Sequence, residues 1–220
     1  MRRVYITSMV LAACVFSAFS VASALASPEW LVDKNLVTEE LPSVTTGELT
    51  FEDMKAVGGP VKAVCPVSFL GTVGIGFLGL IEVVENSKEE SDMICTLLIK
   101  GLCTGETALL EALHLPWLTE LAYTIEGDGI MVRDTIKDSG DGEPAYDAVC
   151  KTIIGEETDE CHGETSYLVE ELAMSTVVSG EFDAASKGVT CSMGGAEQGL
   201  VSSIGPLLIS VPGGHALEIS

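Results

Sequence analysis

Hydrophobic and polar residues alternate over short stretches of this chain, and glycine-rich or acidic turns separate the stretches. Gly47 to Phe51 alternates in this way, and Val61 to Phe69 follows it after the turn Gly58-Gly59-Pro60. Leu118 to Ile125 and Gly129 to Ile136 flank a Glu-Gly-Asp turn. Such alternation is typical of strands that bury one face, and a short glycine-containing connection between two of them indicates a hairpin.

The same pattern recurs along the rest of the chain. Further strands are expected at 29–32, 81–85, 145–154, 166–169, 174–178, 200–203, 207–211 and 216–219, with a hairpin over 93–102. Thr107 to Leu115, ended by Pro116, is the one helix candidate. About ten short strands with regular turns predict an all-β antiparallel sandwich or barrel, formed by a single domain over 27–220.

The first 26 residues have a different pattern. Arg2-Arg3 precedes an apolar run from Val4 to Val21, and the small-x-small triplet Ala24-Leu25-Ala26 follows. These features predict a helical signal peptide over 1–26 that is cleaved on export. An alternative is open, because the residues before Cys14 resemble a lipobox and would make Cys14 a lipid anchor. The mature protein is therefore expected to be secreted, or otherwise lipid-anchored.

One apolar segment of the mature chain is long enough to raise the question of a membrane span. Ala63 to Ile81 has no charged residue and reaches the ~18 residues that a spanning helix needs. It contains Pro66 and four glycines, which make a poor helix, so two buried strands around a glycine turn are expected. Gly74 to Gly79 matches G-x-G-x-x-G, but strand-like residues follow it instead of the helix that a dinucleotide site needs.

Charge limits the partners of the mature chain. When Arg2 and Arg3 leave with the leader, the 11 basic residues become nine against 33 acids, and the net charge falls from −22 to −24. A nucleic-acid partner is excluded on this ground, because phosphate binding needs clustered lysine and arginine. The charge favours a cation or a basic partner instead.

The mature chain has six cysteines, and export to an oxidising compartment predicts that they form three disulfides. Local geometry suggests the pairs. A Lys100-Gly101 turn would join Cys95 to Cys103, and a turn at Gly155-Glu156 would place Cys150 opposite Cys161. The remaining pair is Cys65 with Cys191.

Four segments resemble a group of uncharacterised secreted β-rich proteins of soil actinobacteria. These segments are 30–32, 47–53 with 58–61, 115–121 and 191–195. The resemblance covers nearly the whole mature chain. It implies a secreted β-rich fold, and it adds no catalytic residue because the group has no established activity.

Candidate chemistry is sparse. Asp138, Asp141 and Glu143 form an acidic turn, with Asp134 and Asp147 nearby, that is a candidate calcium site outside the EF-hand pattern. No other cofactor is expected. The thirty-three carboxylates always offer pairs for a carboxylate-dependent hydrolase, but none is singled out. Trp30 and Trp117 could stack on sugars, although core packing is the expected role of Trp117.

The sequence therefore predicts a secreted, disulfide-stapled, non-enzymatic β protein. Its expected role is that of an extracellular or envelope-associated structural or binding module. The alternatives are a calcium- or carbohydrate-binding module and a carboxylate-dependent hydrolase.

Overall fold

The structure of the chain is a computed structural model, and it describes residues 27–53, 56, 58–85, 92–126, 129–171, 177–181, 189–191 and 197–220. The predicted signal peptide, Cys14 and most of the expected strand at 174–178 lie outside these residues. No helix in the described part is long and apolar enough to cross a membrane.

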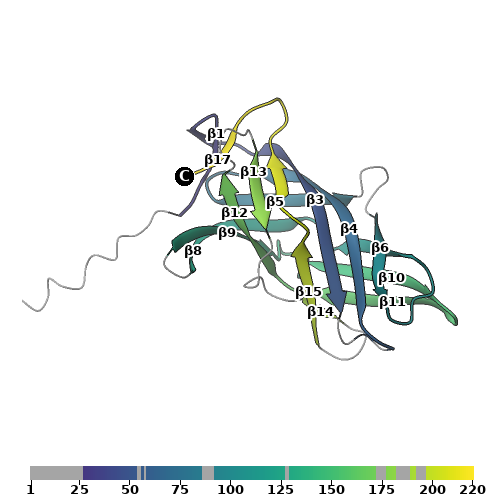
Figure 1. The fold of residues 1–220 in the computed structure, drawn as a ribbon. Coiled ribbons are helices and arrows are strands. Elements are labelled where there is room, and N and C mark those ends of the chain that lie inside the picture. Colours follow the sequence, from purple (N-terminus) through teal and green to yellow (C-terminus); the bar gives the residue numbers. More distant parts are fainter. Residues whose placement is uncertain are drawn as a thin grey trace, which may run out of the picture.

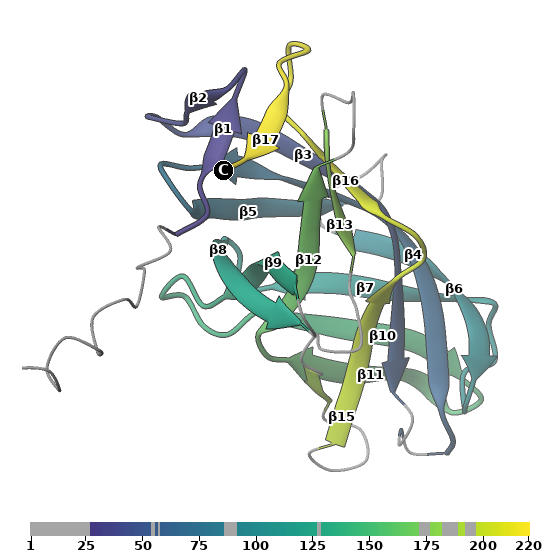
Figure 2. The same ribbon diagram turned by 60° about the vertical axis from the view of Figure 1, so that its left-hand side comes forward.

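The described residues form seventeen β-strands (Figures 1 and 2). They are β1 (Trp30–Val32), β2 (Asn35–Leu36), β3 (Leu41–Asp53), β4 (Val61–Val73), β5 (Leu78–Glu85), β6 (Asp92–Lys100), β7 (Thr107–Leu113), β8 (Trp117–Glu126), β9 (Gly129–Lys137), β10 (Ala145–Thr152), β11 (Gly155–His162), β12 (Thr165–Glu171), β13 (Val178–Glu181), β14 (Val189–Cys191), β15 (Glu197–Ser203), β16 (Leu207–Ser210) and β17 (Leu217–Ile219).

Fourteen of these strands close into one antiparallel barrel. Because β5 and β6 pair in succession with β4, they act as two halves of one long strand. The same holds for β7 with β8, β9 with β10, β11 with β12, β13 with β14, and β15 with β16. With β3 and β4 this makes eight long strands in an up-and-down order, and β15 and β16 close the barrel by pairing with β3.

The six broken strands divide the barrel into two halves. The disulfide half consists of β6, β7, β10, β11, β14 and β15, and the capped half of β5, β8, β9, β12, β13 and β16; β3 and β4 run through both. Hydrogen bonds from side chains join the connection between β7 and β8 to the connection between β9 and β10. His114, with φ of 60°, bonds through Nδ1 to the carbonyl oxygen of Glu143 at 2.8 Å, and Ser139 Oγ donates to the carbonyl oxygen of Pro116 at 2.5 Å.

A three-stranded sheet of β17, β1 and β2 covers the end of the capped half, at the upper left of Figure 1. The sheet joins the two ends of the described chain, since Trp30 pairs with Ile219. It is fixed to the barrel by three bonds: Trp30 N–H to the Gly76 carbonyl at 2.9 Å, the Tyr123 hydroxyl to the Ser220 carbonyl at 2.9 Å, and Ile219 N–H to Glu171 Oε1 at 2.7 Å.

The core is continuous between the two halves. Trp117 is fully buried at the start of β8 and contacts Tyr146 of β10 edge to face, with ring centroids 5.0 Å apart. Tyr146 in turn contacts Phe51 of β3, at 5.2 Å. Trp117 Nε1 donates to the carbonyl oxygen of Leu113 across the strand break, at 2.8 Å. The expected core role of Trp117 is confirmed.

The expected all-β antiparallel fold, a sandwich or a barrel, is confirmed and is a barrel, but the described residues form seventeen strands instead of about ten, and several are longer than predicted. The Gly-Gly-Pro turn joins β3 to β4, and β8 pairs with β9 as expected, with residues 127 and 128 of their turn outside the described part. The segment 63–81 forms strands on both sides of a glycine turn, in which Gly74 N–H donates to the Leu78 carbonyl at 2.7 Å. The G-x-G-x-x-G match is therefore a turn.

The helix expected at Thr107 to Leu115 is wrong, because Thr107–Leu113 form strand β7. Alanine, leucine and glutamate favour a helix, but the segment also alternates, with Ala108, Leu110 and Ala112 buried. Pairing with both β6 and β10 satisfies the backbone and overrides the local preference.

All six cysteines of the mature chain form disulfides, as predicted, but all three predicted pairs are wrong. The bonds are Cys65–Cys95, Cys103–Cys150 and Cys161–Cys191. The expected hairpin over 93–102 does not form, since β6 is a single strand lying along β4, which brings Cys95 beside Cys65.

The second error is one of register. The β10–β11 hairpin turns at residues 153 and 154, so Thr152 pairs with Gly155 and Cys150 lies opposite Glu157 instead of Cys161. Cys161 instead lies directly opposite Cys191 of β14. Cys150 bonds to Cys103 because the β6–β7 connection folds onto β10, where Thr104 N–H donates to the Lys151 carbonyl at 2.7 Å.

Candidate functional site

The disulfide half contains a cavity of about 80 Å³ inside the barrel. Its walls come from β3, β4, β7, β10, β11 and β14, together with Ala56, Leu102 and Cys103 from the connections at this end. Two of the three disulfides, Cys103–Cys150 and Cys161–Cys191, lie in its wall. The covalent bonds therefore fix the strands that shape the cavity.

Small side chains create this space. Ala63 of β4, Ala108 of β7 and Ala148 of β10 point inward, where a barrel interior is normally filled by branched or aromatic side chains. Tyr146 closes the inner side of the cavity and is itself packed against Trp117. Burial raises the pKa of Tyr146, so its hydroxyl stays neutral at ordinary pH.

Carboxylates also line the cavity, next to the alanines, since Asp159 is the cross-strand partner of Ala148. Asp53 of β3 and Asp159 of β11 line it, with only 8% and 9% of their surfaces exposed. Strand β11 also places Glu157 in the wall, two residues before Asp159 and therefore on the same face. None of the described residues that line the cavity is a lysine, an arginine or a histidine. Glu52, at the edge, forms an ion pair with Lys62.

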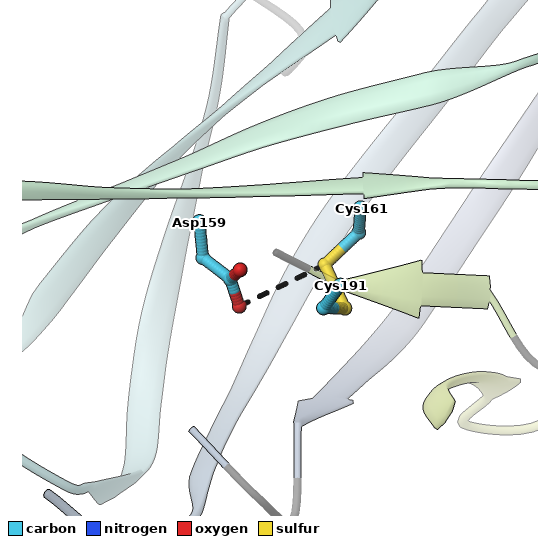
Figure 3. Close-up of side chains that lie close together, drawn as sticks. All are labelled: Asp159, Cys161 and Cys191. Carbon is cyan, nitrogen blue, oxygen red and sulfur yellow. Dashed lines mark hydrogen bonds between the residues drawn. A yellow bond between two sulfur atoms is a disulfide. The ribbon is translucent and has the colours of Figure 1, made fainter. Parts of the chain in front are cut away.

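Asp159 lies beside a disulfide (Figure 3). Its Oδ2 is 3.9 Å from Cys161 Sγ, and the ligand atoms of Asp159, Cys161 and Cys191 lie within 4.8 Å of one another. Because both sulfurs are bonded to each other, Cys161 has no S–H to donate and neither sulfur is a thiolate ligand. The trio therefore offers one carboxylate, which is too few donors for a metal centre.

The candidate calcium residues lie elsewhere, in the connection between β9 and β10. Asp138 Oδ1 accepts the backbone N–H groups of Gly140 and Gly142, at 2.6 and 3.1 Å, so the carboxylate closes its own turn. Among the described residues, Asp138, Asp141 and Glu143 do not form a group with ligand atoms within 4.8 Å. The geometry supports a turn better than a calcium site.

Asp134 is not near that turn's carboxylates but faces the interior of the capped half. It is 2% exposed, and the Tyr167 hydroxyl donates to its Oδ2 at 2.7 Å. Burial raises the pKa of Asp134 to about 7, an effect that the bond from Tyr167 opposes. Burial and the neighbouring Asp134 together raise the pKa of Tyr167 well above its ordinary value. The expectation that Asp134 could join a calcium site is wrong, because the alternation of β9 turns it inward.

Neither tryptophan presents a face to solvent. Trp30 and Trp117 are 1% and 0% exposed, so neither is available for stacking on a sugar. A hexose is also larger than benzene, which occupies cavities of about 150 Å³, so the cavity here is too small for a sugar ring. Neither the tryptophans nor this cavity therefore supports the carbohydrate-binding and glycoside-hydrolase alternatives.

Comparisons with protein-family models, with curated proteins and with solved structures find no match to this chain. What the protein does must therefore be inferred from the cavity and its surroundings.

Sequence reasoning missed this site, although one signal was present. A disulfide cysteine at 161 that faces the interior places 159 and 157 on the same face, because side chains alternate along a strand. Asp53 gave no comparable signal, since its inward position depends on the register of β3 with β4 and β15.

Proposed function

We propose that this protein is a secreted, non-enzymatic binding module that receives a small apolar group in the cavity of its disulfide half. The observation that carries the proposal is the cavity itself, with alanines at inward positions where a filled barrel has large side chains. Concave, mostly apolar sites of this kind at the mouths of barrels are common ligand sites.

The surrounding construction supports a preformed site. Two disulfides lie in the cavity wall, which Phe51 and Tyr146 also line, and Tyr146 is packed against the buried Trp117. A rigid cavity loses little conformational entropy when it binds a ligand. The three disulfides are also compatible with the export that the leader predicts.

The size of the cavity limits the ligand. A space of about 80 Å³ is smaller than the ~150 Å³ cavity that holds benzene and well below the ~300 Å³ of sites for drug-sized molecules. A short alkyl group of about four carbons, or the equivalent part of a larger molecule, is the expected occupant. Because so few atoms are buried, dissociation constants near the millimolar range are expected, on the order of −4 kcal/mol.

Binding is tested by following the methyl resonances of the alanines by NMR during titration with 1-butanol or under xenon pressure. Shifts confined to Ala63, Ala108 and Ala148 are expected. Ala108→Leu should abolish them, because the larger side chain fills the cavity from β7. Thr107→Leu is the matched control, since it adds the same side chain to the exposed face of the same strand. Uniform or absent shifts with butanol, xenon and charged four-carbon probes would overturn the proposal.

A further inference from the structure

Exposed aliphatic side chains gather at the end of the disulfide half where the cavity lies. They come from the end of β6, from the β6–β7 connection and from the β10–β11 turn: Leu98, Ile99, Leu102, Ile153 and Ile154. The two connections are neighbours, because a disulfide joins Cys103 to Cys150. This end lies at the lower right of Figure 1, away from the capping sheet. Apolar side chains that gather on a protein surface indicate contact with another molecule or with a membrane.

This apolar end borders the cavity. Leu102 is exposed to solvent and also lines the cavity, and Thr152, which lines it from β10, directly precedes Ile153. Ala56 adds the β3–β4 connection to the same wall. A molecule that contacts the exposed side chains therefore lies next to the space that receives the alkyl group.

The shape of the apolar end favours a lipid surface over a protein. Ile153 and Ile154 form the two-residue turn at the tip of the β10–β11 hairpin, so they project from the barrel instead of lining a groove. A protein that covers projecting side chains needs a concave surface of matching shape. The boundary between lipid headgroups and acyl chains accepts them without one. A lipid also offers hydrocarbon, which is the chemistry that suits the cavity.

The charged residues around the apolar end carry both signs. Lys100 and Lys151 lie within two residues of the exposed aliphatic positions, and Glu156 is the cross-strand partner of Lys151. With Lys62 at the start of β4, three of the six described basic residues are found at this end, although the mature chain has a net charge of −24. A lysine beside an apolar surface can lay its methylenes along it and reach a phosphate with its ammonium. Mixed charges of this kind match a headgroup that is itself zwitterionic.

We propose that this end of the disulfide half docks on a zwitterionic lipid surface, with Leu102, Ile153 and Ile154 in the apolar layer and Lys100 and Lys151 at the level of the phosphates. The proposal deepens the proposed function and rests on it in one respect, because the lipid supplies the short alkyl segment that enters the cavity. An anionic surface repels a chain of this net charge, so the lipid must carry no net charge.

The test is flotation of the protein with unilamellar vesicles of phosphatidylcholine. The protein is collected after export, so that the apolar leader predicted over 1–26 does not contribute to binding. Flotation with phosphatidylcholine is expected, with little dependence on salt. Replacing about a third of the lipid by phosphatidylglycerol should weaken binding about fivefold or more at low salt, and less at physiological salt.

The double variant Ile153→Ser with Ile154→Ser should weaken vesicle binding about tenfold or more, because two aliphatic side chains no longer enter the apolar layer. The matched control is Ile125→Ser with Ile130→Ser, which removes two exposed isoleucines near the β8–β9 turn. That turn lies at the other end of the long strand formed by β9 and β10, so the control should change binding less than twofold.

A second measurement needs no variant. In NMR spectra of the wild-type protein with vesicles, phosphatidylcholine that carries a spin label on its acyl chain should broaden the methyl resonances of Ile153, Ile154 and Leu102. Those of Ile125 and Ile130 should stay sharp. A folding defect in a double variant therefore does not decide the result.

The outcomes separate this proposal from the proposed function. Absence of flotation, or equal flotation of the two double variants, shows that the docking proposal is wrong, while shifts of the alanine methyl groups with 1-butanol keep the proposed function. Stronger binding to vesicles with phosphatidylglycerol also contradicts it. Self-association in analytical ultracentrifugation that Ile153→Ser with Ile154→Ser abolishes assigns the surface to a second copy instead. Flotation that depends on Ile153 and Ile154, with no alanine shifts, supports docking and contradicts the proposed function.

Discussion

Inward positions of the capped half carry Trp117, Leu121 and Tyr167, whereas those of the disulfide half carry Ala63, Ala108 and Ala148. Both halves belong to the same eight long strands, and only their contents differ. Large side chains fill the capped half, and the sheet of β1, β2 and β17 closes it. The disulfide half holds a cavity, and all three disulfides are found there.

The difference teaches how a barrel can keep an internal space. Inward alanines give up the roughly 1.5–3 kcal/mol that each buried large apolar side chain supplies, so the disulfide half is poorer in packing energy. Cross-links reduce the entropy of the unfolded chain and offset this loss without filling the cavity. Among the described residues the capped half has no disulfide, and large buried side chains fill its interior.

Removing the disulfides is the most direct test of whether the two halves are stabilised in different ways. The disulfides close loops of 30, 47 and 30 residues, and the chain-entropy model gives about 4 kcal/mol for each. Full reduction should therefore lower Tm by more than about 15 °C, which is the largest effect expected for this protein. Hydrogen exchange should show β6, β7, β10 and β11 losing protection before β8, β9 and β12.

The pair Cys103→Ser with Cys150→Ser refines this test, because it removes the bond between the β6–β7 connection and β10 alone. It should lower Tm by about 8–16 °C, in proportion to one disulfide. Equal loss of protection in both halves after reduction would contradict the assignment of different stabilising devices to the two halves.

In the capped half the corresponding change is Trp30→Ala. Trp30 belongs to β1 of the capping sheet, and its side chain is only 1% exposed. Truncation of a buried tryptophan costs about 3–5 kcal/mol. Unlike reduction, it should first expose β1, β17 and the end of the capped half. Leu36→Ala is the control, since Leu36 lies in β2 of the same sheet but is 52% exposed.

Trp30→Phe tests whether the stability lost in Trp30→Ala comes from the buried volume of the side chain. The indole Nε1 has no hydrogen-bond partner among the described residues, so replacement by phenylalanine removes volume but no hydrogen bond that the structure records. Tm should fall by less than half as much as with alanine. A loss for Leu36→Ala as large as that for Trp30→Ala would show that the capping sheet is not held by burial of Trp30.

A third test uses pH and concerns the buried pair of the capped half. The pKa of Asp134 rises from 3.8 to about 7 in the folded protein, so the folded state holds a proton that the unfolded state releases. Stability from this group is therefore full below about pH 4, falls as the pH rises to about 7, and is lost above it. The loss is on the order of 4 kcal/mol at most.

Asp134→Asn removes this titration and keeps an oxygen that can accept the Tyr167 hydroxyl. Measured by denaturant unfolding from pH 4 to 8, the difference in stability between the variant and the wild type should grow in favour of the variant as the pH rises. Tyr167→Phe should have the opposite effect, because removing the donor raises the pKa of Asp134 further. A constant difference between Asp134→Asn and wild type across this range would contradict a proton on Asp134.

Much of the fold could be predicted from the sequence, because the alternation of apolar and polar residues indicates where a strand lies and which of its faces is buried. The alternation in 47–51 and 61–69 and the Gly-Gly-Pro turn were enough to place the β3–β4 hairpin. The alternation over 107–113 was also present, but helix-favouring residues masked it. Only the pairing of β7 with two neighbours decides between the two structures.

The candidate site depends on facts that are not local. The disulfide pairs depend on which strands are neighbours in the barrel. Cys161 lies opposite Cys191 only because β11 and β14 pair with each other. The β10–β11 turn lies two residues earlier than Gly155-Glu156, and this shift alone separates Cys150 from Cys161. The cavity likewise requires alanines from β4, β7 and β10 to converge, and no short stretch of sequence contains that relation.

The smallest effect is expected at the hairpin ends, which again differ between the halves. Ile125 and Ile130 are cross-strand partners near the end of the β8–β9 hairpin, so Ile125→Thr should lose about 0.2–1 kcal/mol of pair energy. Ile153 and Ile154 form the β10–β11 turn and are 88% and 84% exposed, with no such pairing. Replacing both with asparagine should change Tm by less than about 2 °C.

This last comparison separates intrinsic stability from assembly. If the double variant at 153 and 154 lowers Tm by several degrees, and the loss depends on protein concentration, the exposed isoleucines are buried against another molecule in solution. If Tm is unchanged at all concentrations while Ile125→Thr lowers it slightly, the turn of the disulfide half contributes nothing to stability.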